Sequence, residues 1–396
     1  MTKKSDAPAI RFKGFSDAWE QRKAKELFIS TADKGYPDLP VLSATQDRGM
    51  IRRDENSINI FHDKKNEAGY KRVLPGQFVI HLRSFQGGFA HSTIEGITSP
   101  AYTVFGFSEP EKHDSEYWKY VFTSKAFIRR LETVTYGIRD GRSISYDEFL
   151  TLGFAYPSKA EQTAIARYLD KLSDLITLHQ RKFEKLTNVK KSMLEKMFPQ
   201  NGSSYPEIRF KGFTDPWEQR KLGELALFNP KDELPQTFEY VDLESVVGTE
   251  MLSHRTEAKL SAPSRAQRLA HTGDLFYQTV RPYQKNNYLF EKPDNNYVFS
   301  TGYAQMRPYV DGYFLLSLVQ SDRFVKVVLD NCTGTSYPAI NANDLAKIEV
   351  TAPSDENEAQ KIGTIFRNID NLITLHQREL EMLQNIKKSM LEKMFV

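Results

Sequence analysis

Two stretches of the chain carry apolar residues at alternating spacings of three and four, the pattern of a helix that buries one stripe. The first stripe consists of Leu169, Leu172, Ile176, His179, Phe183, Leu186, Lys190, Met193 and Met197. The second consists of Phe366, Ile369, Ile373, His376, Leu380, Leu383, Lys387, Met390 and Met394. The pattern predicts long helices over about 158–198 and 354–396. At 1.5 Å per residue, the first stripe implies about 42 Å of helix.

Local signals indicate where these helices begin and end. Ser158 is followed three residues later by Glu161, a capping-box pattern. Ser354 and Asn357 take these places in the second helix, where the box is less complete. Pro199 and the polar run after it end the first helix and form a linker. The two stripes can be buried against each other, or each helix can pack on its own module.

The chain repeats itself around these helices. Residues 8–23 return nearly unchanged at 206–221, and two helix segments, 175–181 and 190–198, return in the second helix in the same order. The two inserts between the repeated segments, roughly 25–155 and 223–351, hardly resemble each other. We call the repeated segments the frame. One frame with two different inserts is expected of a protein that reads two different ligands with one scaffold.

The repeated opening segment contains three aromatic residues, Phe12, Phe15 and Trp19, among basic ones. Their counterparts are Phe210, Phe213 and Trp217. Residues that read different ligands should differ between the copies, whereas these are identical. We therefore expect them to dock onto the long helices or the inserts.

The inserts have mixed α and β patterns. Segments 77–82, 101–105 and 274–280 are short, rich in β-branched and aromatic residues, and predict strands. Segments 117–133 and 313–329 have apolar faces of helical period and predict one helix each. The predicted fold class is α+β.

Composition and motifs narrow the functional classes. The net charge of +3 neither requires nor excludes nucleic-acid binding. One cysteine, Cys332, and no apolar stretch of membrane-spanning length lead us to expect a cytoplasmic protein. Phosphate-binding loop, dinucleotide turn, zinc-protease and nucleophile-elbow motifs are missing, and 229–231 only begins like an amino-methyltransferase motif. For His179 and His376 on the stripes, packing and register are favoured over catalysis.

Each insert has a polar loop with basic and aromatic residues after a predicted strand, at 81–91 and 278–287. A second loop lies near the end of each insert, at 136–145 and 333–341. Arg and Gln can pair bidentately with base edges, and Lys can hold phosphates. Each loop alone could equally be a solvated turn, but their pairing across different inserts favours a DNA-contacting surface.

The predicted contacts divide between the inserts. In the first insert they are Lys64, Lys65, Lys71, Arg72, Arg83, Ser84, Gln86, Arg139, Arg142 and Ser143. In the second they are Thr279, Arg281, Tyr283, Gln284, Lys285, Asn286, Thr335, Ser336 and Tyr337.

Three motifs occur in a fixed order over essentially the whole chain. They are the repeated Ile-Arg-Phe-Lys-Gly-Phe opening, the run from Pro157 to Leu169 into the first helix, and the helix ending Lys-Lys-Ser-Met-Leu-Glu-Lys-Met-Phe. With this combination the chain resembles the specificity subunits of Type I restriction-modification enzymes. The second helix departs from the pattern, because the Glu-Gln pair at 161–162 has no clean counterpart after Pro353.

The resemblance implies two globular target recognition domains of mixed α and β structure, separated by two long antiparallel coiled-coil helices with a pseudo-twofold repeat. The implied divisions are 1–156 for the first recognition domain, 157–199 for the first helix, 200–222 for the linker and frame, 223–352 for the second recognition domain and 353–396 for the second helix. Each recognition domain would read one half of a bipartite, asymmetric double-stranded DNA site, and the helices would set the spacer.

The resemblance also implies partners. Two methyltransferase subunits using S-adenosylmethionine, and restriction subunits using ATP, would join this chain, which would itself hold no cofactor, metal or catalytic residue. Two alternatives stay open: a coiled-coil scaffold with two domains for ligands other than DNA, and a stand-alone methyltransferase, against which the missing motifs argue.

Overall fold

The computed structural model describes residues 8–45, 47–55, 64–136, 143–200, 202–294, 296–334 and 336–395. The chain forms two compact units: Met1–Leu178 with Glu379–Val396, and His179–Arg378. Each long helix therefore contributes a part to each unit. Within the described ranges, no helix combines the length and the apolar character needed to cross a membrane.

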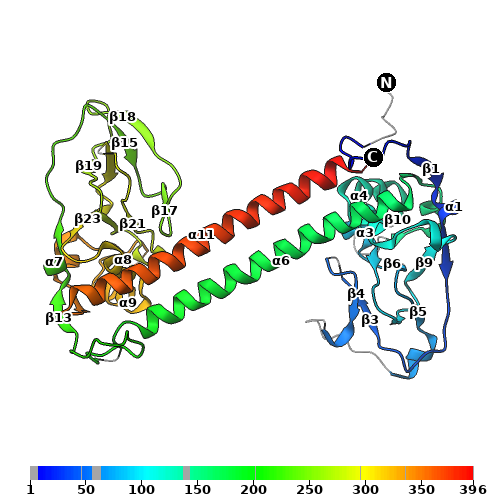
Figure 1. Cartoon of the computed structure of the whole chain (residues 1–396), viewed down its shortest axis with the longest axis horizontal. Helices are drawn as coiled ribbons and strands as arrows, with labels where there is room; N and C mark the ends of the chain where they lie inside the picture. The colour runs from blue at the N-terminus through cyan, green and yellow to red at the C-terminus, as the bar shows by residue number, and fades with distance from the viewer. Residues whose placement is uncertain are drawn as a thin grey trace. The chain divides into compact units, whose positions relative to one another are not determined.

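A four-stranded antiparallel sheet forms the centre of the first unit (Figure 1). Its strands in spatial order are β2 (Phe28–Thr31), β9 (Thr103–Phe107), β6 (Phe78–Ile80) and β7 (Ala90–His91). Two-stranded pairs are β3 (Leu42–Ala44) with β4 (Met50–Arg52), β5 (Lys71–Val73) with β8 (Gly96–Thr98), and β10 (Thr135–Tyr136) with β11 (Ser143–Ile144). Aromatic rings fill the core: the centroid of Phe28 lies 5.6 Å from that of Phe105 and 5.2 Å from that of Trp118. Such edge-on ring pairs add to the apolar burial.

The second unit has a central sheet with the same strand order. Its strands are β14 (Ala226–Phe228), β23 (Tyr303–Pro308), β20 (Leu275–Gln278) and β21 (Tyr288–Leu289). A further sheet consists of β18 (Arg255–Ala258), β15 (Thr237–Val241), β22 (Tyr297–Ser300) and β19 (Ala266–Leu269), in which β15 and β22 are parallel. A hairpin joins β16 (Val246–Val247) to β17 (Glu250–Met251). The two inserts thus share a central topology although their sequences hardly resemble each other, and the predicted α+β class is confirmed.

The repeated opening segment closes each insert into a module. In the first unit β1 (Glu20–Lys23) pairs with β12 (Gly153–Tyr156), and in the second β13 (Glu218–Lys221) pairs with β24 (Glu349–Ala352), both antiparallel. Short helices follow the frame strands, namely α1 (Ala24–Leu27) and α7 (Leu222–Leu225), and others precede the closing strands, namely α5 (Tyr146–Phe149) and α10 (Ala342–Lys347). Turns of 3₁₀ helix cover Arg53–Glu55, Lys64–Gly69, Pro110–Lys112, Glu132–Val134 and Pro282–Gln284.

Each of the two helices predicted inside the inserts is interrupted at one residue and forms two shorter helices. The prediction of one continuous helix in each insert was therefore wrong. The pairs are α3 (Ser115–Thr123) with α4 (Lys125–Leu131), and α8 (Gly312–Gln320) with α9 (Asp322–Asp330). The break falls on Ser124 in one and Ser321 in the other, both with extended backbone. Each serine hydroxyl accepts a hydrogen bond from the N–H three residues on, at 3.1 and 3.2 Å, and so caps the second helix.

Replacing Ser321 by alanine should cost about 0.5–2 kcal/mol of unfolding free energy, because the buried N–H of Phe324 loses its acceptor. Urea denaturation followed by circular dichroism measures this. Ser192→Ala, at an exposed position inside the first long helix, is the matched control and should be neutral or slightly stabilising. Equal stability of both variants would contradict the capping role.

The long helices are α6 (Lys159–Lys196) and α11 (Glu356–Lys393). In the second unit they are antiparallel, because His179 contacts His376 and Lys190 Nζ lies 2.6 Å from Asp370 Oδ1. Every residue of the two predicted stripes is buried or half-buried, whereas neighbours such as Leu175 are exposed. Both alternatives for burying the stripes occur, since their outer ends pack into the module cores.

An arginine of the repeated opening segment binds a glutamate in the first turn of each long helix. The predicted capping role of Glu161 is corrected by this contact. The buried Glu161 carboxylate accepts from Arg11 Nε at 2.8 Å and Nη2 at 2.6 Å. Its counterpart in the second helix is Glu358, not Asn357, and it accepts from Arg209 at 2.7 and 2.8 Å. The predicted equivalence of Asn357 with Glu161 is therefore wrong by one residue, because it pairs Ser354 with Ser158 although the repeated helix segments lie 197 positions apart.

The frame aromatic residues dock as predicted. The ring of Phe12 meets Tyr168 of α6 edge-on with centroids 5.5 Å apart, and Trp19 is buried in the first core. In the second unit Lys361 of α11 lies over the ring of Phe213, 4.8 Å from its centroid, and Trp217 is buried.

Candidate nucleic-acid interface

The two loops predicted in the second insert lie side by side in the second unit. The first connects β20 to β21, and the second precedes α10. Val280 and Ala339 form an antiparallel bridge, Arg281 N donates to Pro338 O at 2.8 Å, and Ile340 N donates to Thr279 O at 3.0 Å. Residues about 60 positions apart therefore form one surface.

Arg281 lies where the two loops meet and is half-buried. Its backbone is left-handed, with φ 53° and ψ 56°, which is costly for a residue with a side chain and requires support from its surroundings. The guanidinium lies 4.5 Å from the ring centroid of Tyr337, which is 63% exposed. Tyr283 beside it is 50% exposed, and Ser336 is exposed. The result is a stacked cation flanked by exposed aromatic and hydroxyl groups.

Buried amides hold the base of this loop. Gln278 Nε2 donates to Val280 O at 2.6 Å and to Gln284 Oε1 at 2.8 Å. Asn287 Oδ1 accepts from Gln278 N at 2.9 Å. Gln278 and Asn287 were not predicted, since an amide in a polar loop gives no sign of burial in the sequence. They fix the loop that presents Arg281.

Three predicted contacts in this loop are engaged inside the second unit. Thr279 is buried, and its hydroxyl donates to Gly302 O at 2.8 Å. Lys285 Nζ bonds to Gln320 O at 2.8 Å and pairs with Asp322, whose pKa it lowers. Asn286 Oδ1 accepts from Gly248 N at 2.9 Å. In this structure these three side chains hold the conformation of the loop and are not directed to a ligand.

The corresponding loop of the first unit connects β6 to β7 and contains α2 (Ser84–Gly87). Arg83 and Gln86 are exposed. Ser84 is fully buried, and its hydroxyl accepts from His81 N at 2.8 Å. His81 Nδ1 accepts from Arg83 N at 3.3 Å, and burial lowers the pKa of His81 to about 4, with the Arg83 charge adding to the shift. This loop therefore presents Arg83 and Gln86 over a neutral imidazole.

The other predicted cations of the first unit differ in their surroundings. Arg72 pairs with Glu95 and with Asp33 at 3.4 Å, and lies over the ring of Tyr36. Lys71 Nζ donates to Tyr102 O at 2.7 Å, and burial lowers its pKa. Lys64 and Lys65 are exposed. Arg139, Arg142 and Thr335 lie outside the described residues, and Ser143 is described only by its backbone in β11.

Basic residues that the sequence analysis missed line a hollow of about 860 Å³ in the second unit. Lys190 and Lys191 of α6, Arg323 and Lys326 of α9, and the predicted Lys285 surround it, together with the carboxylates of Glu195 and Asp322. Lys190 and Lys285 are ion-paired with Asp370 and Asp322. A lysine on a helix face is usually just solvated, so only the fold reveals that these five converge. Such a hollow attracts anions such as backbone phosphates.

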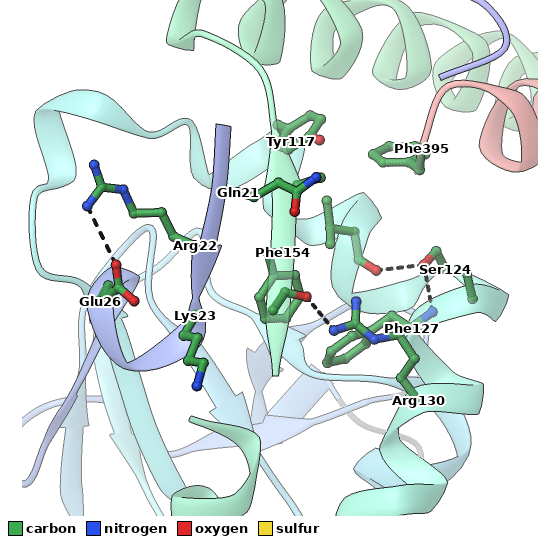
Figure 2. Close-up of a pocket in the computed structure, with 14 residues that line it drawn as sticks. Gln21, Arg22, Lys23, Glu26, Tyr117, Ser124, Phe127, Arg130, Phe154 and Phe395 are labelled. Atoms are coloured by element: carbon green, nitrogen blue, oxygen red, sulfur yellow. Dashed lines mark hydrogen bonds and ion pairs between the residues drawn. The ribbon is translucent and has the colours of Figure 1, made fainter. Parts of the chain in front are cut away.

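Figure 2 shows a different hollow, of about 680 Å³, in the first unit between β1, β12 and α4. Arg130 lies over the ring of Phe154 there, and burial lowers the Arg130 pKa. None of the predicted contacts lines this hollow. At the corresponding place in the second unit the hollow has a volume of only about 80 Å³, and Phe198 and Pro199 are among the residues that line it. This hollow therefore belongs to the frame and not to the paired loops.

The fold and the paired loops define a two-module protein in which one frame presents two different polar surfaces. Residues 252–385 match the Type I restriction modification DNA specificity domain. The chain is 23% identical over 262 residues to the Type I restriction enzyme MjaVIII specificity subunit of Methanocaldococcus jannaschii, a match that spans 61% of this chain and 61% of that relative. Residues 252–385 thus match a Type I specificity domain, and the chain is similar to a Type I restriction enzyme specificity subunit, in line with the resemblance carried by its repeated motifs.

A solved structure shares the fold. The crystal structure of the S subunit of a Type-I restriction-modification system from M. genitalium aligns with a TM-score of 0.62 over 98% of this chain and 99% of that chain, at 14% identity. That likeness concerns the fold alone.

Proposed function

We propose that this chain is the DNA-reading subunit of a Type I restriction-modification complex, and that each unit reads one half of a bipartite, asymmetric site. One observation carries the proposal: two inserts of unrelated sequence share a central strand order and place a basic loop at the same connection, β6–β7 and β20–β21. A common framework with exchanged loop residues is what two different half-sites require.

In this proposal residues of the paired loops read bases, and the basic hollow holds the phosphate backbone of the DNA. Arg281 and Tyr337 in the second unit, and Arg83 and Gln86 in the first, would contact base edges in the major groove. Lys191 and Lys326 of the 860 Å³ hollow would hold phosphates. The recognition domains would comprise 1–156 and 223–352, and the two long helices would set the unread spacer.

The same proposal assigns the chemistry to partners. Two methyltransferase subunits would bring S-adenosylmethionine, and restriction subunits would bring ATP, while this chain supplies no catalytic residue and no cofactor. The repeated frame offers each methyltransferase copy an equivalent surface.

Single-molecule sequencing of DNA from cells that express this chain with its candidate methyltransferase tests the proposal. We expect methyladenine in both halves of a split motif, lost when this chain is deleted. Exchanging 223–352 for the matching segment of another such chain should change one half only. An active methyltransferase with no split motif would instead support a scaffold for ligands other than DNA. DNA affinity that falls steeply with salt would argue against that scaffold.

A further inference from the structure

The two long helices bring a pair of identical side chains together in the second unit. His179 of α6 and His376 of α11 belong to the repeated heptapeptide Leu-Ile-Thr-Leu-His-Gln-Arg, 197 positions apart. Their Nδ1 atoms lie 3.2 Å apart, their ring centroids 5.2 Å apart, and both side chains are half-buried. A polar pair in an apolar stripe weakens the helix contact unless it has a specific use.

The distance between the nitrogens suits a metal ion. Zn²⁺ binds imidazole nitrogen at about 2.0–2.1 Å in tetrahedral geometry, which places two such nitrogens about 3.3 Å apart. The observed 3.2 Å therefore fits an ion bridging both Nδ1 atoms with little movement of either ring. The ion and the hydrogen bond between the rings are alternatives, because both need the same lone pairs. Half-burial leaves room for water to complete the coordination.

We propose that His179 and His376 bind one divalent transition-metal ion, with Zn²⁺ the best suited, and that the ion clamps α6 to α11. Imidazole ligands favour the later first-row metals over Mg²⁺ and Ca²⁺, so the site should discriminate against those. In the neutral pair, binding through both Nδ1 atoms requires each ring to carry its proton on Nε2, so the proton between the rings moves to Nε2 and no net proton is released. The proposal stands independently of DNA recognition.

Calorimetry of the metal-stripped full chain with ZnCl₂ tests the clamp. We expect one site per chain and a higher unfolding temperature that rises with Zn²⁺ concentration. His179→Gln and His376→Gln should each weaken Zn²⁺ binding at least tenfold. Both variants keep a side chain able to hydrogen-bond its partner, and their unfolding temperatures without metal report whether they fold normally.

The second unit offers a matched control. His254 Nδ1 lies 2.7 Å from Glu239 Oε2 and could bind metal by itself. His254→Gln should leave the site intact. The proposal is overturned if Zn²⁺ does not bind the wild-type chain at millimolar concentration, or if the double variant at 179 and 376 binds it as well as wild type.

Discussion

Replacing Arg11 by methionine is expected to lower the unfolding free energy of the first unit by about 3 kcal/mol. The Glu161 side chain is 2% exposed and would be left as a buried carboxylate without its bidentate partner. Losing one partner of a buried pair costs about 3–5 kcal/mol, and the lower end applies because the Arg11 side chain is 15% exposed. Urea denaturation gives the magnitude, and hydrogen exchange read by mass spectrometry locates the loss.

The second unit sharpens this prediction. Glu358, the counterpart of Glu161, also accepts from Trp217 Nε1 at 3.2 Å, whereas Trp19 Nε1 makes no hydrogen bond within the described ranges. Arg209→Met leaves one donor in place, so it should destabilise its own unit less than Arg11→Met does.

Arg22→Met is the exposed control. Arg22 pairs with Glu20 at the surface, and its loss should hardly change stability. Equal effects of Arg11→Met and Arg22→Met would show that the frame is not held by buried charge.

Replacing Arg281 by glycine is expected to weaken specific DNA binding by about 1–3 kcal/mol and to relax only the half-site read by the second unit. Glycine is the informative choice because it accepts φ 53° without strain, so the loop keeps its backbone while the guanidinium is lost. Binding of the assembled complex to oligonucleotides with every base varied in each half-site measures both effects.

Two comparisons decide how Arg281 acts. Lys292→Ala removes a similar cation, 4.5 Å from the ring centroid of Tyr297, away from the paired loops, and should not change specificity. Arg281→Lys keeps the charge and loses the bidentate fork. If Arg281→Gly weakens binding to all DNA equally, the residue holds a phosphate rather than a base.

The sequence by itself determined the frame, because a heptad stripe and a repeat are local, periodic signals. Leu172 and Ile176 fall on the buried side of α6, as their spacing predicted. The two inserts, the α+β class and the docking of Phe12 and Trp19 also followed from patterning. A capping serine inside an apolar run is a local signal too, yet Ser124 and Ser321 were passed over because the helical period continues across them.

Only the tertiary structure decided which polar groups are presented. Thr279 and Ser84 are polar loop residues like Arg281, yet both are buried with their hydroxyls engaged. Glu161 was read as a helix cap, but its partner Arg11 stands 150 positions away. Periodicity reports the neighbours of a residue along one element, whereas hydrogen-bond partners and exposure depend on what other elements bring to it. That is why the frame could be predicted and the site could not.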